Sequence, residues 1–172
     1  MRNNALILLV ALFSLISCGK DDNPPTSGTI TIDNTTFLSQ TYFVYGFLFS
    51  EAKLVSTLGK PAPDITIDSD GANLFFQANN LKDSFYKAGE YNDALSAETA
   101  FDNLTSLNVT LWAGLATPVI ANQIWIYRSG TEHYAKIRII STVSEIRSDR
   151  PYAECTFQWV YQPDGTLTFP EK

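Results

Sequence analysis

The stretch "CTFQWVY" at residues 155–161 alternates large apolar side chains with mostly polar ones. Because successive side chains of a β-strand point to opposite faces, Cys155, Phe157, Trp159 and Tyr161 would share one face. The opposite face would be polar except at Val160. This period of two predicts one strand of an antiparallel sheet with a single dry side.

The sequence on both sides of this strand predicts β-hairpins. Downstream, "QPDG" at 162–165 is typical of a tight turn, since proline presets φ and Gly165 accepts a positive φ, and "TLTF" would return as a strand. Upstream, "QIWIYRSGTEHYAKIRIIST" at 123–142 reads as strand, turn and strand, with residues 129–131 as the connection.

The first half of the chain shows further strand patterns. Strands are predicted at 29–33, 42–50, 53–57, 65–67, 73–78 and 106–114, whereas 79–89 resembles a loop. A composition of 11 Phe, 8 Tyr and 3 Trp agrees with this. One helix of one or two turns is expected within 92–104, started by Asp93 or Ser96 and burying Leu95, Phe101 and Leu104. The fold class predicted is therefore all-β, antiparallel, with one short helix.

The N-terminus has the features of a lipoprotein signal. The apolar run at 5–16 is too short to span a bilayer, which needs about 20 residues. It follows Arg2 and ends at Leu15-Ile16-Ser17-Cys18, which resembles the bacterial lipobox. In such signals the cysteine is acylated and becomes the new N-terminus. Residues 1–17 are thus expected to be the signal peptide and Cys18 the lipidation site; an ordinary secretory signal with a chance cysteine is the alternative.

Residues 18–28 are expected to form a lipidated, flexible linker to a β domain at 29–172. The stretch "GKDDNPPTSG" has no residue suited to a core. Its "KDD" resembles the export signal of Bacteroidetes-type surface lipoproteins, although a chance charge cluster would look the same. Several acyl chains hold a protein durably, because each buried CH₂ contributes about 0.8 kcal/mol. The expected location is the outer membrane, facing outward.

Charge and cysteine content exclude some roles. Removal of residues 1–17 leaves 155 residues, enough for one domain, with 11 basic side chains against 18 acidic ones. This acidic balance argues against a nucleic-acid partner. With Cys18 acylated, Cys155 has no disulfide partner within the chain, and we expect it to be a buried core thiol.

Residue patterns typical of enzymes are missing from the sequence. It contains no Gly-x-Ser-x-Gly, His-Glu-x-x-His or Cys-x-x-Cys, and only one histidine, His133. The carboxylates Asp68 and Asp70 fit a turn better than an acid pair. We therefore expect a binding protein and not an enzyme.

The segments at 124–141 and 155–169 resemble the closing hairpins of the HmuY-like lipoproteins. "YGFLFSEAKLVS" at 45–56 is similar to an earlier segment of that family, and the lipobox agrees with it. The likeness covers about Tyr42 to Phe169. Its matching positions in the last two hairpins are Arg128, Tyr134, Lys136, Phe157, Tyr161, Gln162, Asp164 and Gly165.

This resemblance implies a two-sheet, sandwich-like domain on the outer membrane that captures haem and delivers it to a TonB-dependent receptor. In the founding members two His or Met side chains hold the iron. Here the only methionine is Met1, inside the signal, and the only histidine is His133. One chain therefore cannot supply such a pair.

The remaining candidates for a haem or porphyrin site follow from residue type. His133 is the candidate metal ligand, with a solvated hairpin residue as its alternative, and Tyr134 or Cys155 could also bind iron. Arg128 or Lys136 could meet a propionate. The tryptophans, Trp125 among them, could stack on a ring or instead pack in the core. An accessory interaction or glycan-binding lipoprotein without haem is the alternative function.

Overall fold

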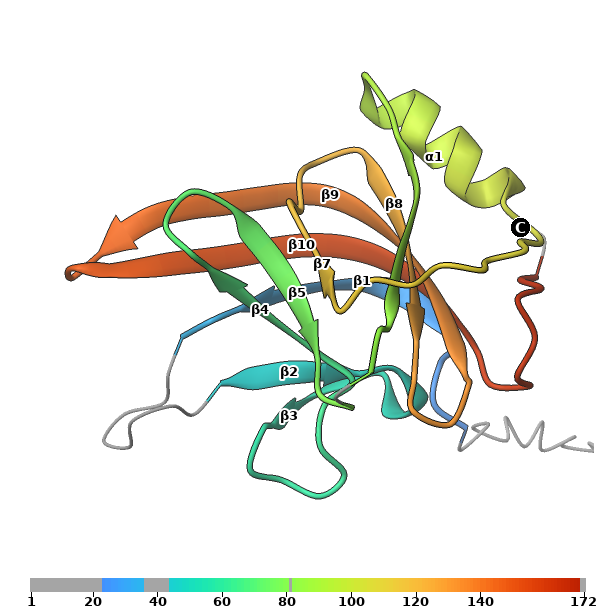
Figure 1. Ribbon diagram of the computed structural model, residues 1–172, viewed down its shortest axis with the longest axis horizontal. Coiled ribbons are helices and arrows are strands. Elements are labelled where there is room, and N and C mark those ends of the chain that lie inside the picture. The colour runs from blue at the N-terminus through green and yellow to red at the C-terminus, as the bar shows by residue number, and fades with distance from the viewer. Residues whose placement is uncertain (1–22, 36–43, 81, 171–172) are drawn as a thin grey trace, which may run out of the picture.

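The computed structural model describes residues 23–35, 44–80 and 82–170 as two stacked antiparallel β-sheets with one short helix (Figure 1). The predicted all-β fold is confirmed. The first sheet has the strand order β1 (Ser27–Asp33), β10 (Arg150–Gln162), β9 (Tyr134–Arg147), β8 (Gln123–Arg128), β6 (Phe85–Glu90). The second has the order β3 (Lys53–Ser56), β2 (Tyr45–Leu48), β4 (Ile65–Ser69), β5 (Leu74–Ala78), β7 (Leu115–Ala116).

The main core fills the space between the two sheets. The four residues predicted to share a face, Cys155, Phe157, Trp159 and Tyr161, all belong to it. Phe47 of β2 reaches across, with its ring centroid 5.9 Å from that of Phe157 and 5.2 Å from that of Trp159. Edge-on and tilted ring contacts of this kind stabilise aromatic cores beyond the buried area alone.

Strand β2 ends two residues earlier than predicted, and the predicted positions 42 and 43 lie outside the described residues. It ends at Leu48 and continues as a single 3₁₀ turn, η1 (Phe49–Glu51), before Ala52 takes a positive φ of 51° and β3 begins. The turn carries Phe49 into the core, where its ring stacks on that of Tyr127 at 5.4 Å.

Strands β9 and β10 form a long two-stranded ribbon. Its turn lies at Ser148 and Asp149, whose φ angles of 50° and 61° suit a tight hairpin. Because β8 pairs with β9 only over Tyr134–Arg138, the ribbon continues beyond β8 (Figure 1). The predicted upstream hairpin, β8–β9, is confirmed, but the β9–β10 turn was not predicted from the sequence.

The outer face of the first sheet carries a second, smaller core under helix α1 (Ala94–Asn103). Asp93 caps the helix, as one of the two predicted caps, by accepting a 2.8 Å hydrogen bond from the Ser96 amide. The helix is longer than the one or two turns expected. Phe101 is buried as predicted, but Leu95 is 73% exposed, so the prediction that it faces the core is wrong.

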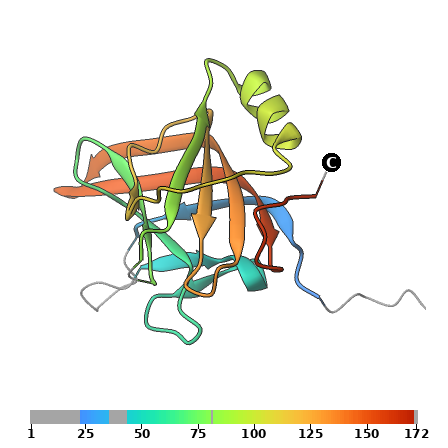
Figure 2. The same ribbon diagram turned by 45° about the vertical axis from the view of Figure 1, so that its right-hand side comes forward.

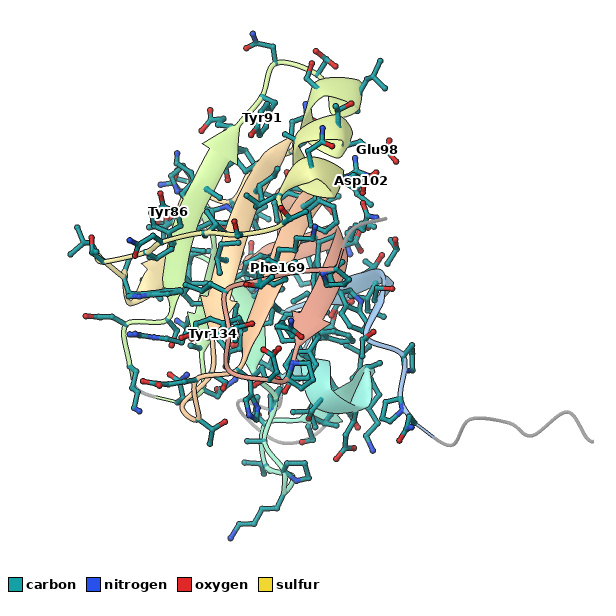
Figure 3. All side chains as sticks on the ribbon, turned by 90° about the vertical axis from the view of Figure 1, so that its right-hand side faces the viewer. Tyr86, Tyr91, Glu98, Asp102, Tyr134 and Phe169 are labelled. Carbon is teal, nitrogen blue, oxygen red and sulfur yellow. The ribbon has the colours of Figure 1, made fainter. Side chains whose placement is uncertain are left out.

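Two segments differ from their predicted structure because they pack across the outer face of the first sheet and do not form strands. Residues 106–114 form no regular strand; they cross over β6 and β8 as a strap that leads into β7 (Figures 2 and 3). Residues 163–170 do not return as a hairpin strand. Gly165 has the expected positive φ of 80°, but the chain then runs across the outer face and buries Phe169. The two segments are joined by a bridge between Ser106 and Thr168.

Strand β6 lies in a region that was predicted to be a loop. It pairs with β8 through a register shift between Lys87 and Gly89, so its alternation is interrupted. This strand is the edge of the first sheet, and the strap runs beside it, with Phe85 bridged to Ala113.

Candidate functional site

The five candidate ligand-binding residues lie on both faces of the first sheet. His133 and Trp125 point to the inner side, toward the main core. Arg128, Tyr134 and Lys136 lie on the outer side, the face seen in Figure 3. The structure therefore does not bring all five together, and it places the neighbours His133 and Tyr134 on opposite faces.

His133 is held within the connection between β8 and β9. Its amide donates a 3.0 Å hydrogen bond to Oγ of Ser129, and its carbonyl accepts one of 2.8 Å from the Ser129 amide. Its Nδ1 lies 3.1 Å from the Tyr161 hydroxyl. The ring is partly buried, so it is more fixed than a fully solvated hairpin residue.

Lys136 is engaged beneath the helix. Its side chain is 2% exposed, and its ammonium donates hydrogen bonds of 2.7 Å and 3.0 Å to the carbonyls of Phe101 and Leu104. These carbonyls belong to the C-terminal turn of α1, where the helix dipole favours a cation. Lys136 is thus positioned to cap the helix and lies away from any open surface.

Arg128 and Tyr134 meet at one tryptophan. They are cross-strand partners in β8 and β9. The Arg128 guanidinium lies 4.5 Å from the ring centroid of Trp112, a cation–π distance, and also donates a 2.8 Å hydrogen bond to the Asp83 carbonyl. The Tyr134 ring is 6.1 Å from Trp112 and the Tyr86 ring 6.5 Å. These contacts fix the orientation of the Trp112 indole on the strap.

A hollow of about 400 Å³, which we name the strap hollow, opens beside Trp112 where the strap meets the β6 edge. Its volume falls in the range typical of small-molecule sites. Its lining is mainly aromatic and aliphatic: Phe85, Tyr86, Lys87, Leu111, Trp112, Ala113, Leu115, Thr117 and Trp125. The candidate Trp125, which is otherwise buried, thus reaches this hollow from the inner side.

The orientation of Trp125 is set by a polar network. Its indole N–H donates a 2.9 Å hydrogen bond to Oε1 of Gln123, which is itself buried. The Gln123 amide in turn donates a 3.1 Å hydrogen bond to Oε2 of Glu90. That oxygen also accepts from Lys87 at 3.0 Å, and the pKa of Glu90 is lowered chiefly by this contact with Lys87. The network connects the floor of the hollow to its charged rim.

Two exposed leucines, one on the strap and one in β7, line the hollow. Leu111 is 81% exposed, and Leu115 beside it is also exposed. Single exposed leucines are common on protein surfaces, so the aromatic lining beside them is what indicates a binding surface. The lining suits a mainly apolar molecule; within it Trp112 belongs to the outer face, whereas Trp125, only 4% exposed, belongs to the inner one.

Metal ligands, the Cys155 thiol and helix hydrophobicity are three further features of the described part of the chain. It contains no cluster of three or more His, Cys, Asp or Glu placed to hold a metal ion. Cys155 is fully buried, as predicted, and burial raises the pKa of its thiol far above the usual range, so it is inert. No helix within 23–35, 44–80 or 82–170 has the length and hydrophobicity to cross a membrane.

Tyr86 and Lys87 are not among the residues predicted from sequence, because the prediction for 79–89 is a loop and the structure has strand β6 there. The signal was present in "FYKAGEY" at 85–91, where Tyr86 and Ala88 alternate with Phe85 and Lys87. Trp112 was among the tryptophans considered for stacking, but nothing in the sequence placed it next to Trp125.

No family model and no curated protein sequence matches this chain. Cys18, the expected lipidation site, lies outside the described residues.

Proposed function

We propose that this protein is a non-catalytic ligand-binding lipoprotein, anchored to the outer membrane through acylated Cys18 and displayed outward. Its ligand is a flat, largely apolar molecule held in the strap hollow, and a haem-type porphyrin is the first class to test. The observation that supports this best is the joint lining of a 400 Å³ hollow by Trp112 and Trp125.

In this proposal a porphyrin is bound by its ring faces and not by its iron. His133 is absent from the lining of the strap hollow, and its Nδ1 contacts Tyr161. Without a second histidine or a methionine in the mature chain, a two-ligand clamp cannot form in one copy. Binding should therefore be indifferent to the metal, so that iron-free protoporphyrin IX binds as well as hemin.

The test is a titration of residues 24–172 with hemin and with protoporphyrin IX, followed by the Soret band and by tryptophan fluorescence. We expect both ligands to bind and Trp112→Ala to weaken both, because it removes one wall of the hollow. The matched control His133→Ala should leave both affinities unchanged. Loss of hemin binding in His133→Ala, with Trp112→Ala unaffected, would contradict the proposal.

Transfer of the ligand to a TonB-dependent receptor is the partner function that the HmuY-like resemblance implies. Transfer to such a receptor is expected if the ligand is a porphyrin. Co-purification of the acylated protein with a receptor from outer membranes, with and without hemin, tests it.

A second candidate function is an accessory interaction or glycan-binding lipoprotein without haem. It is favoured by the missing second axial ligand and by Trp112 with its neighbours Tyr86 and Tyr134, since aromatic side chains also stack on sugar rings. A glycan array with residues 24–172 and the Trp112→Ala variant separates the two. Glycan signals lost with Trp112, without any change in the Soret band, would establish this alternative.

A further inference from the structure

The strap hollow has one charged residue at its rim. Of the nine described residues that line it, Lys87 alone carries a charge, and the other polar groups belong to Tyr86, Thr117 and the two tryptophans. A ligand in the hollow therefore meets a mainly apolar lining and a single cation. This asymmetry suits a ligand that has an apolar body and an anionic group.

Lys87 has a defined position relative to the floor of the hollow. It is the cross-strand partner of Trp125 in the β6–β8 pair, and its ammonium lies 6.0 Å from the Trp125 ring centroid. An anion bound by this ammonium would therefore lie near Trp125, on the inner side of the hollow. The position of the Lys87 ammonium, 6.0 Å from the Trp125 ring centroid, thus fixes the place of the anionic group of the ligand.

The ammonium can accept a further anion beside Glu90. Lys87 and Glu90 form an ion pair whose side chains are 42% and 49% exposed, and exposed pairs of this kind contribute little to stability. An ammonium has three N–H donors, of which Glu90 occupies one. Glu90 is also held by Gln123, so it keeps a donor when Lys87 shifts toward a ligand.

The two cations considered from the sequence are engaged elsewhere. Arg128 stacks on Trp112 and bonds the Asp83 carbonyl, and Lys136 is buried beneath α1. Neither lines the strap hollow. Within the described residues Lys87 is thus the cation at the proposed site.

We propose that Lys87 determines ligand class at the strap hollow, which takes flat apolar molecules bearing a carboxylate and discriminates against their neutral forms. This inference rests on the proposed function, since it concerns the same hollow. Removal of the carboxylate charge from the ligand, or of the ammonium from the protein, should have the same effect on affinity.

The experiment compares protoporphyrin IX, which has free carboxylates, with its neutral dimethyl ester by tryptophan quenching in residues 24–172. We expect the acid to bind about two- to fivefold more tightly than the ester, the size of one partly exposed ion pair. In Lys87→Met, which keeps an unbranched apolar stem, the acid should bind as weakly as the ester. The matched control is Lys53→Met, which removes another exposed lysine that pairs with a glutamate, Glu51, away from the hollow.

A second variant tests the contact between Lys87 and the ligand carboxylate through an expected increase in affinity. Glu90→Gln removes the carboxylate that competes for Lys87, so affinity for the acid should rise several-fold while affinity for the ester stays the same. Equal binding of acid and ester, both weakened by Trp112→Ala, would overturn the role of Lys87 and leave the proposed site intact. Binding of neither ligand would overturn the proposed porphyrin site and this inference with it.

Discussion

The hydroxyl of Tyr127 in β8 donates a 3.0 Å hydrogen bond to Oδ1 of Asp64, which immediately precedes β4 in the other sheet. The second carboxylate oxygen accepts a 2.8 Å hydrogen bond from the Phe49 amide. One side chain thus connects both sheets and the 3₁₀ turn at the end of the sandwich. Its satisfied oxygens explain how a carboxylate is tolerated beside the main core.

Tyr127→Phe should lower the free energy of unfolding by about 1.5–3 kcal/mol, because it leaves a partly buried carboxylate oxygen without its donor. Urea denaturation followed by fluorescence measures this. The control is Tyr152→Phe on the ribbon, whose hydroxyl bonds Glu154 at 2.7 Å within the same strand and not between the sheets. A loss in Tyr152→Phe as large as in Tyr127→Phe would contradict the importance of the inter-sheet bond.

The stability contributed by Asp64 should increase as the pH falls. Burial raises the pKa of its carboxyl, against the opposing effects of the Phe49 amide, the Tyr127 hydroxyl and the charge of His133. The folded protein therefore binds this proton more tightly than the unfolded chain, so stability is gained as the pH falls through the raised pKa and is lost as the pH rises through it.

The measurement is the difference in unfolding free energy between the wild-type protein and Asp64→Asn at several pH values from 7 down to about 4, the unfolded pKa of aspartate. The unfolding free energy of the wild-type protein should rise relative to that of the variant as the pH is lowered. Exposed carboxyls with lowered pKa values, such as Asp93, act in the opposite direction but are common to both proteins. A difference that moves the other way would show that the hydrogen bonds outweigh burial.

Gly46→Ala should destabilise the second sheet. A Cβ at this position of β2 would lie 2.3 Å from the Ile65 carbonyl oxygen and 2.6 Å from Cβ of Pro63, and a backbone oxygen in a strand cannot move aside cheaply. We expect a loss of about 1–3 kcal/mol in thermal or urea unfolding, the usual range for overpacking. Gly28→Ala is the control, since its nearest contact, to Trp159, is an ordinary 3.4 Å; equal losses would exclude the steric explanation.

The main core could be predicted from sequence because the period of two at 155–161 has one apolar side and one polar side. The same reasoning could not orient β8, where Ile124 and Ile126 are as apolar as Trp125 and Tyr127, because both faces of the first sheet are covered. Two-sided burial removes the alternation that identifies the inner face.

The outer-face segments were missed for a related reason. Residues 106–114 have the residue types of a strand. Whether such a segment pairs in a sheet or crosses its face depends on which apolar surfaces elsewhere in the fold it can bury. Here Phe169 and the strap bury the outer side of β8 and β9. The position of Lys136 beneath α1 depends on this tertiary arrangement and left no mark in the local sequence.

Cys155 should not react with thiol reagents in the folded protein. It is fully buried, and burial raises the pKa of the thiol far above its usual range, so the thiolate is scarce at pH 8. In residues 24–172 it is the only cysteine, and a disulfide-exchange reagent should find one thiol after denaturation and none before it. Stoichiometric labelling under native conditions would show that the strand β10 opens or that the core is looser than described.

Lys136→Met should destabilise the protein by removing the donor that holds the end of α1. The carbonyls of Phe101 and Leu104 would lose their hydrogen bonds in a place that water reaches poorly, which costs about 1–3 kcal/mol. Lys82→Met is the matched control, because Lys82 also donates to a backbone carbonyl, that of Gly130 at 2.9 Å, but on an exposed surface. We expect that control to change unfolding by less than about 0.5 kcal/mol, as most surface substitutions do. Equal losses in the two variants would mean that burial of the ammonium beneath the helix adds nothing to the hydrogen bond. A Lys136→Met protein as stable as the wild type would mean that the apolar contacts of α1, those of Ala97 and Phe101 among them, hold the helix without this lysine.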